Sequence, residues 1–461
     1  MSDVEDVDVE LRVTPAFQLD SAPAVRRRVL DLAGPALVEM LLVTLVGMAD
    51  MIMVGRIGPA SIAAVGLTNQ PVFFATAVFM ALNVGTTAVI ARAIGADEKP
   101  VADDALRQSF MLTTIMGIGV SVLGLAFARD VMVLMGAEED VIPLGVAYMQ
   151  IVAAGAVFML LTMSVAAALR GAGDTMTPMK VNAFCNILNV FGNYVLIYGK
   201  LGFPRMGVAG AALSTSISRA IAFVLIMRVV TGGKFILHLS GPLRFDFPLI
   251  RRIVNIGIPA AVEQLILRGG QLAYLRIVAG FGTAVVASHQ IAMNILGLSF
   301  MPGQAFAVAA TTLVGQGLGA HRADLAEKGA LETRRIGMMI SGFMAFVFIL
   351  FGRYIAMLYS NDPTVVAKTG VVLRIIGLVQ PAQSTQFILA GGLRGAGDTK
   401  WPLYSTAIGI WGFRVALGYL LAVTLDMELV GAWIAMAIDQ IVRSGIILFR
   451  FRSGRWKLAR V

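Results

Sequence analysis

Long apolar stretches alternate with short charged or Gly- and Pro-containing segments along almost the whole chain. A helix needs about 20 apolar residues to cross a bilayer, and stretches near that length or longer recur throughout. We predict twelve membrane-spanning helices, which begin near Pro35, Ala60, Ala105, Pro143, Pro178, Gly207, Val254, Ala284, Gly329, Val366, Pro402 and Val430. The pattern therefore predicts an all-α integral membrane protein.

The composition supports this prediction. The 461 residues are 57% hydrophobic and 14% charged, with a mean hydropathy of +0.81, which a water-soluble fold could not accommodate. Residues 1–25 are acidic and lack a continuous apolar core, so we predict a disordered cytoplasmic tail there rather than a signal peptide. The single cysteine, Cys185, excludes an internal disulfide, and the three histidines have no metal-ligand spacing, so we expect no metal site and no cofactor.

The net charge of +9 reflects membrane topology rather than a nucleic-acid partner. With the N-terminus inside, the segments on the cytoplasmic side hold 24 Lys and Arg residues and those on the opposite side hold six. Cytoplasmic loops of membrane proteins carry such an excess of basic residues. We therefore predict that both termini are cytoplasmic, and we expect no nucleic-acid binding.

The heptapeptide LRGAGDT occurs twice, at 169–175 and at 393–399, an offset of 224 positions. The same offset relates other residues that low-complexity apolar sequence does not explain, among them Pro35 and Pro259, Glu39 and Glu263, Gly95 and Gly319, and Arg219 and Arg443. We infer an internal duplication. It predicts an N-terminal six-helix lobe at 26–230, a cytoplasmic linker at 231–248, and a C-terminal six-helix lobe with a short basic tail at 249–461.

Each half has an even number of spans, so the second half re-enters the membrane in the orientation of the first. We therefore predict two lobes related by a pseudo-two-fold axis along the membrane normal, with a cleft between them. Rocking of such lobes opens the cleft to one side of the membrane and then to the other.

The repeated heptapeptide itself is predicted to form a tight cytoplasmic turn. Its glycines suit the left-handed end of a helix, and Asp174 and Asp398 follow them, where a carboxylate accepts backbone N–H groups. We assign Arg170, Asp174, Arg394 and Asp398 to this turn. A structural role is the main interpretation, and a latch on the cytoplasmic side is the alternative.

Several motifs in fixed order resemble those of the multidrug and toxic compound extrusion (MATE) family. They are MADMIMVGRIGPASIAAVGL after the first apolar span, LRGAGDT after the fourth, NILNVFGNYVLIYGKLG in the fifth and GVAGAALSTSIS at the start of the sixth. These motifs are most similar in sequence to those of the DinF-like branch of the family. The resemblance implies two six-helix lobes that export amphipathic, often cationic compounds, driven by inward flow of protons or sodium ions.

An acid in the hydrocarbon region costs about 2.5–3.5 kcal/mol, so each such residue needs a reason. Asp50 lies in the first span with no Lys or Arg one turn away, Asn189 and Asn193 share one face of the fifth span, and Thr215 enters from the sixth. Oxygens of these types suit a proton or a small cation such as Na⁺. The resemblance implies that these four residues form the cation-coupling cluster. A structural acid and asparagines that join helices are the alternatives.

The substrate cleft is predicted to contain Glu39, Met53, Glu263, Gln264 and Gln383. Glu39 and Asp50 are eleven residues apart, close to three helical turns, so they are expected to form one polar stripe. Glu263 matches an acidic position that the resemblance links to cations, but the tenth span has glutamines instead of an acid. We also expect Asp439 and Arg443, at i and i+4, to neutralise each other, and Arg219 to have only a packing role.

These observations predict a secondary antiporter that exports amphipathic, cationic compounds in exchange for protons or sodium ions. It is expected to act as a monomer in the inner membrane of a prokaryote, with lipids and small-molecule substrates as its partners. A lipid or lipid-linked sugar flippase of the same superfamily is one alternative. A polytopic membrane enzyme is another, but no catalytic constellation or P-loop is present.

Overall fold

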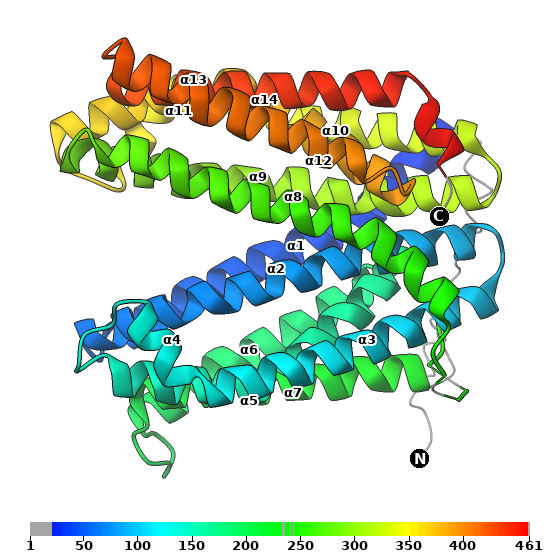
Figure 1. Ribbon diagram of the computed structural model, residues 1–461, viewed down its shortest axis with the longest axis horizontal. Helices are drawn as coiled ribbons and strands as arrows, with labels where there is room; N and C mark the ends of the chain where they lie inside the picture. Colours follow the sequence, from blue (N-terminus) through cyan, green and yellow to red (C-terminus); the bar gives the residue numbers. More distant parts are fainter. Residues whose placement is uncertain (1–20, 233–235, 240, 243, 460–461) are drawn as a thin grey trace, which may run out of the picture.

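The computed structural model describes residues 21–232, 236–239, 241–242 and 244–459, and every regular element in these ranges is helical. The helices form two lobes that touch at one end and diverge at the other, which makes the molecule V-shaped (Figure 1). The predicted fold class, two six-helix lobes in the same orientation, is confirmed. We call the end at which the lobes touch the closed end and the other the open end.

The two lobes repeat the same order of helices. The N-terminal lobe contains α1 (Ala22–Gly55), α2 (Pro59–Gly95), α3 (Lys99–Ala126), α4 (Ala128–Leu134), α5 (Ile142–Ala172), α6 (Met176–Tyr198) and α7 (Gly207–Thr231). The C-terminal lobe contains α8 (Phe247–Ala279), α9 (Thr283–Gly319), α10 (Ala323–Met357), α11 (Pro363–Gly395), α12 (Lys400–Ala407), α13 (Ala416–Tyr419), α14 (Glu428–Arg452) and a final 3₁₀ turn (Arg455–Leu458). π-Helical turns at Ile408–Val415 and Leu420–Thr424 extend α12 and α13 into one long rod.

The offset of 224 is visible in the helix boundaries and in the polar contacts. Helices α2 and α9 begin and end at equivalent positions, and α6 and α12 begin at equivalent positions. Thr87 donates its hydroxyl to the carbonyl of Ala167 at 3.0 Å, and its equivalent Thr311 donates to that of Gly391 at 2.9 Å. The duplicated sequence therefore folds into duplicated tertiary contacts.

Eleven of the described helical rods are long and apolar enough to cross a membrane. The twelfth, α8, is 33 residues long but carries five charged residues, which lower its hydropathy. The first rod also begins earlier than predicted. Residues 1–20 of the predicted tail lie outside the described ranges, but Ser21 caps α1 and Pro23 lies in its first turn, so residues 22–25 are helical.

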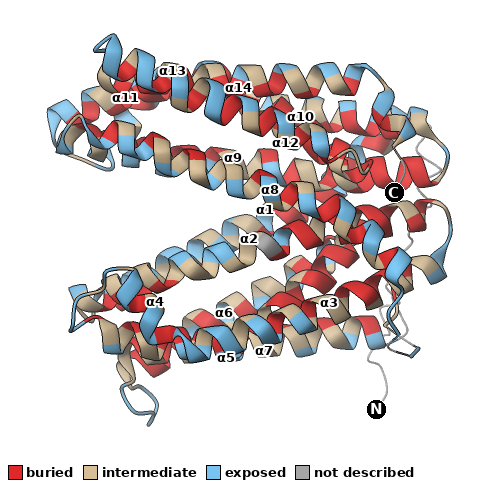
Figure 2. Ribbon diagram, viewed as in Figure 1, coloured by how far each residue is buried: buried red, intermediate tan, exposed pale blue. Residues whose placement is uncertain are grey.

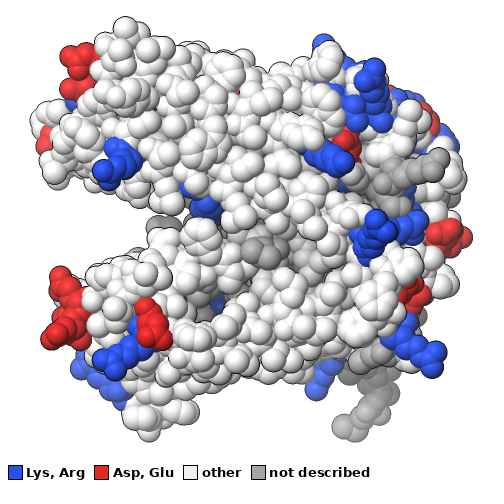
Figure 3. Space-filling view, in the orientation of Figure 1, with Lys and Arg blue, Asp and Glu red and all other residues white. Residues whose placement is uncertain are grey.

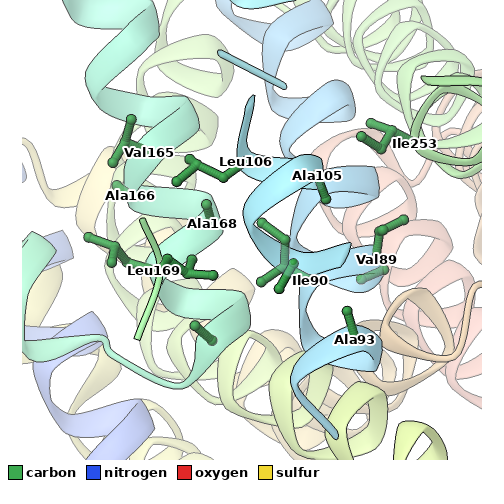
Figure 4. Close-up of a cluster of buried hydrophobic side chains, with 14 of the residues drawn as sticks. Val89, Ile90, Ala93, Ala105, Leu106, Val165, Ala166, Ala168, Leu169 and Ile253 are labelled. Carbon is green, nitrogen blue, oxygen red and sulfur yellow. The ribbon is translucent and has the colours of Figure 1, made fainter. Parts of the chain in front are cut away.

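Small residues let the lobes meet backbone to backbone at the closed end. A Cβ atom added to Gly257 of α8 would lie 2.9 Å from the carbonyl oxygen of Ala81 in α2. Gly95 and Gly319 likewise lie in close contact with backbone atoms of the opposite lobe, so neither position has room for a Cβ atom. An apolar core continues across this junction, because Ile253 of α8 packs with residues of α2, α3 and α5 (Figure 4). Figure 2 shows buried residues concentrated inside the lobes and at this end.

Candidate functional site

A groove opens between the lobes at the open end of the molecule (Figure 3). Helices α1 and α2 lie on one side of it and α8 and α9 on the other (Figure 1). On the face shown, charged side chains gather at the two ends of the molecule and a largely uncharged band separates them (Figure 3). Charged or polar groups inside this band are therefore the candidates for function.

The predicted cation cluster comes together in the N-terminal lobe. Asn193 Nδ2 of α6 donates to Asp50 Oδ1 of α1, and Asn189 Nδ2 lies 3.2 Å from Thr215 Oγ1 of α7. With the Asn189 amide rotated by half a turn, its nitrogen lies 3.2 Å from Asp50 Oδ1 and its oxygen accepts from Thr215. The rotated orientation gives both amide atoms a partner and joins all four residues in one network.

The side chains of the cluster are rich in oxygen atoms of the kinds that bind cations. Asp50 forms no salt bridge within the described ranges. The side-chain oxygen of Asn193 is buried without a hydrogen-bond donor, and Asn189 is buried as well. One carboxylate with neighbouring amide and hydroxyl oxygens is a donor set that suits a proton or a hard cation such as Na⁺.

The structure adds one residue that the sequence reasoning missed, Ser214, and places Arg219, which was expected to have only a packing role, beside the cluster. Ser214 donates its hydroxyl to the carbonyl oxygen of Asn189 at 2.9 Å. Arg219 lies close enough to Asp50 and Tyr148 to interact with both electrostatically. The spacing of Thr215 and Arg219, at i and i+4 on α7, could have indicated that Arg219 shares the face of the cluster.

The structure places Glu39 and Glu263, which were predicted to lie in the substrate cleft, in buried salt bridges inside the two lobes. Glu39 is buried and accepts from Arg170 at 2.7 Å and from Asn182 at 2.6 Å. Glu263 is buried in the equivalent place and accepts from Arg394 at 2.8 Å. A carboxylate in a membrane lobe gains from a guanidinium partner, so each acid turns into its own lobe and away from the groove.

The other three predicted cleft residues do not meet in one place. Met53 packs partly buried beside the open end of α1, where its carbonyl accepts from Tyr198 at 3.0 Å. Gln264 is partly exposed on α8. Gln383 is buried inside the C-terminal lobe, where it lines a small cavity with Ser299 and Gln380.

The repeated turn is only partly as predicted. Gly173 and Gly397 have left-handed backbones, with φ of 95° and 85°, and Asp174 Oδ1 accepts from the backbone N–H of Thr177 at 2.9 Å. Asp398, however, pairs with Arg450 at 2.6 Å rather than capping the turn.

Arg170 and Arg394 also leave the turn, because each points to the buried glutamate of its own lobe. The long arginine side chains reach a neighbouring helix, which offers a carboxylate that the turn does not.

The expected pairing of Asp439 with Arg443 is replaced by a longer-range one. Asp439 forms its salt bridge with Arg414, which comes from the π-helical part of the rod after α12, and both side chains are buried. Arg443 instead donates to Thr406 Oγ1 at 2.9 Å, and Thr406 donates to Glu263 at 3.0 Å. The C-terminal lobe thus encloses two buried polar groups, and the acid in each has an arginine partner.

Two parallel helical lobes around an intramembrane groove define a multi-pass membrane transporter. The MatE family model matches residues 35–195 and again 259–420, and the chain belongs to this family, that of the MATE transporters. Each matched segment lies within one half of the internal repeat, and the two segments begin 224 positions apart.

Relatives match over almost the whole chain. A protein of Thermotoga maritima named probable multidrug resistance protein NorM is 30% identical, with 95% of this chain and 94% of the relative covered. The uncharacterized transporter YisQ of Bacillus subtilis is 28% identical, with 92% and 94% covered. A solved outward-facing structure of a multidrug resistance MATE family transporter superposes with a TM-score of 0.87 at 25% identity, covering 95% of this chain and 97% of that one.

Proposed function

We propose that the protein exports amphipathic compounds from the cell in exchange for protons or sodium ions. The observation that carries the proposal is the cluster around Asp50, an intramembrane carboxylate with oxygen-rich neighbours and no salt bridge within the described ranges. An acid in such a place is usually functional. The names of the matching relatives, which are multidrug resistance proteins, support drug export as the transported reaction.

The charge distribution supports an orientation for this cycle. Basic residues predominate at the closed end, which we assign to the cytoplasm together with both termini. The structure is then open to the outside. We place the protein in the inner membrane of a prokaryote as a monomer.

Coupling follows from the position of the cluster between three helices. Asp50 is on α1, Asn189 and Asn193 are on α6, and Thr215 is on α7, so a bound ion holds these helices together. An ion that binds one packing of the lobe more tightly than the other shifts the conformational equilibrium by that difference in affinity. The substrate binds in the groove and shifts the same conformational equilibrium. Ion and substrate are then carried across the membrane in opposite directions.

Two finer assignments belong to the same proposal. The C-terminal lobe holds Glu263 in a salt bridge and has glutamines where an acid would complete a second ion site. We therefore assign ion coupling to the N-terminal lobe, and we keep the DinF-like branch as a prediction from the sequence motifs. Cationic substrates were expected from the resemblance to the MATE family, with Glu39 and Glu263 as predicted cleft acids. Both acids form salt bridges with arginines, so they do not support that expectation.

Everted membrane vesicles test the proposal. Wild-type vesicles should take up a fluorescent amphipathic compound when a proton or sodium gradient is imposed, and dissipation of the gradient should abolish uptake. Asp50→Asn should fold and reach the membrane but lose gradient-driven uptake. Glu139→Gln is the matched control, because this acid lies exposed in a loop. An Asp50→Asn protein that couples as well as the wild type contradicts the proposal.

A further inference from the structure

One stripe of α8 points across the groove toward the N-terminal lobe. At the closed end this stripe is marked by Gly257, which packs against Ala81 of α2. With 3.6 residues per turn, Gln264, Arg268 and Gln271 follow Gly257 on nearly the same face, about two, three and four turns further on. The helical period therefore places Arg268 on the same face of α8 as Gly257, the face that meets the N-terminal lobe at the closed end.

Arg268 is an exposed cation at intramembrane depth. It lies eleven residues before the end of α8 at Ala279, a distance of about 16 Å along the helix. Its guanidinium contacts Gln271 Oε1 at 3.4 Å and forms no salt bridge within the described ranges. Placing an arginine side chain in lipid at this depth would cost about 2.5–3.5 kcal/mol or more of free energy, whereas in the groove the side chain can be hydrated and can bind a ligand.

The opposite wall supplies an apolar partner surface without a competing acid. Helix α2 contains no Asp or Glu. Phe74 and Gln70 lie on the stripe of α2 that includes Ala81, about two and three turns toward the open end, and both side chains are exposed. An aromatic ring and an amide thus stand across the groove from the guanidinium.

The balance of charge in the groove favours an anion. Its four lining helices contain the acids Asp31, Glu39, Asp50 and Glu263. Glu39 and Glu263 form salt bridges with arginines, and Asp50 accepts a hydrogen bond from Asn193 inside the N-terminal lobe. Asp31 lies at the closed end of α1, far from the position of Arg268 on α8.

We propose that Arg268 binds the anionic group of an amphipathic organic anion, such as a carboxylate or sulfonate, while Phe74 contacts the apolar body. The inference rests on the proposed export function and assigns its substrate class. A guanidinium pairs with a carboxylate through two parallel hydrogen bonds, and the neighbouring Gln264 and Gln271 can add further ones.

A matched pair of fluorescent probes tests the assignment. Dansylglycine carries a carboxylate and dansylcadaverine an ammonium on the same fluorophore. In proteoliposomes with an imposed ion gradient, the wild type should transport dansylglycine with the lower KM. Arg268→Gln should raise the KM for dansylglycine about tenfold or more, as expected for the loss of a charge-assisted bond, and leave dansylcadaverine unchanged or improved. Arg268→Lys should retain most of the affinity.

Arg276→Gln is the control, because Arg276 is exposed on the same helix but about a quarter turn away from the stripe. Gradient-driven transport of dansylcadaverine alone, or an unchanged KM for dansylglycine in Arg268→Gln, overturns the anion assignment and leaves the export function standing. Absence of gradient-driven transport of either probe overturns the export function itself. If phosphatidylglycerol in the vesicles raises the KM for dansylglycine in the wild type but not in Arg268→Gln, Arg268 holds a lipid headgroup and the assignment is also overturned.

Discussion

The buried pair of Glu263 and Arg394 is the contact whose loss should destabilise the C-terminal lobe most clearly. The Glu263 side chain is 5% exposed, and Arg394 donates to both of its oxygens at 2.8 Å. Arg394→Met keeps an unbranched apolar side chain but removes the guanidinium, so that within the described residues the hydroxyl of Thr406 remains as the hydrogen-bond donor to the carboxylate. Removal of one partner from a buried pair costs about 3–5 kcal/mol. For a lobe of this size we expect the melting temperature to fall by about 6 °C or more.

The chain offers a separate probe for each lobe. All four tryptophans are in the C-terminal half, and the single cysteine, the buried Cys185, is in α6 of the N-terminal half. In detergent, Arg394→Met should lower the melt detected by tryptophan fluorescence more than the melt detected by a thiol-reactive dye at Cys185. Arg170→Met removes the equivalent partner of Glu39 and should do the reverse.

A second substitution separates the loss of the charge pair from loss of packing. Arg394→Met combined with Glu263→Gln removes the stranded charge and should recover at least half of the lost melting temperature. If the tryptophan melt of Arg394→Met is unchanged, the reasoning about the buried pair is refuted. The same conclusion follows if the double variant is no more stable than the single one.

Two further predictions concern the closed end and the ion cluster. Gly319→Val places a side chain against the backbone of Arg92, so the lobes should separate at the closed end. The distance between spin labels at the open ends of the two lobes should then decrease. Gly342→Val is the control, because an added Cβ there meets nothing within 4 Å, and it should leave that distance unchanged. Asn193→Leu removes the amide that donates to Asp50 and should weaken the apparent ion affinity by about tenfold. The measurement is the ion concentration that half-saturates transport. An unaltered concentration would contradict the role of the cluster.

The internal repeat made much of the architecture predictable from sequence. A constant offset implied two equivalent lobes, and it correctly related Glu39 to Glu263. It could not show that both acids are neutralised, because Arg170 and Arg394 follow the acids by 131 positions and belong to a different helix. Such contacts depend on how helices pack, and the periodicity of a single helix carries no information about them.

The ion cluster was predictable to the extent that its residues lie in the resembling motifs. These motifs predict that Asp50 and Asn193 lie together, and the structure joins them by a hydrogen bond. Arg414 had no such signal, because the equivalent position in the N-terminal half is Val190. Its salt bridge with Asp439 arises from the π-helical turns after α12, and these have no counterpart in the regular helix α6.

The Arg414–Asp439 bridge makes the two copies mechanically unequal. In the C-terminal lobe, sliding the rod that carries Arg414 along α14 would pull a guanidinium away from a fully buried carboxylate, so this lobe resists internal deformation. The N-terminal lobe has no equivalent brace at Val190 and Thr215. Bending within a lobe should therefore occur mainly in the N-terminal lobe, while the C-terminal lobe moves as a rigid body.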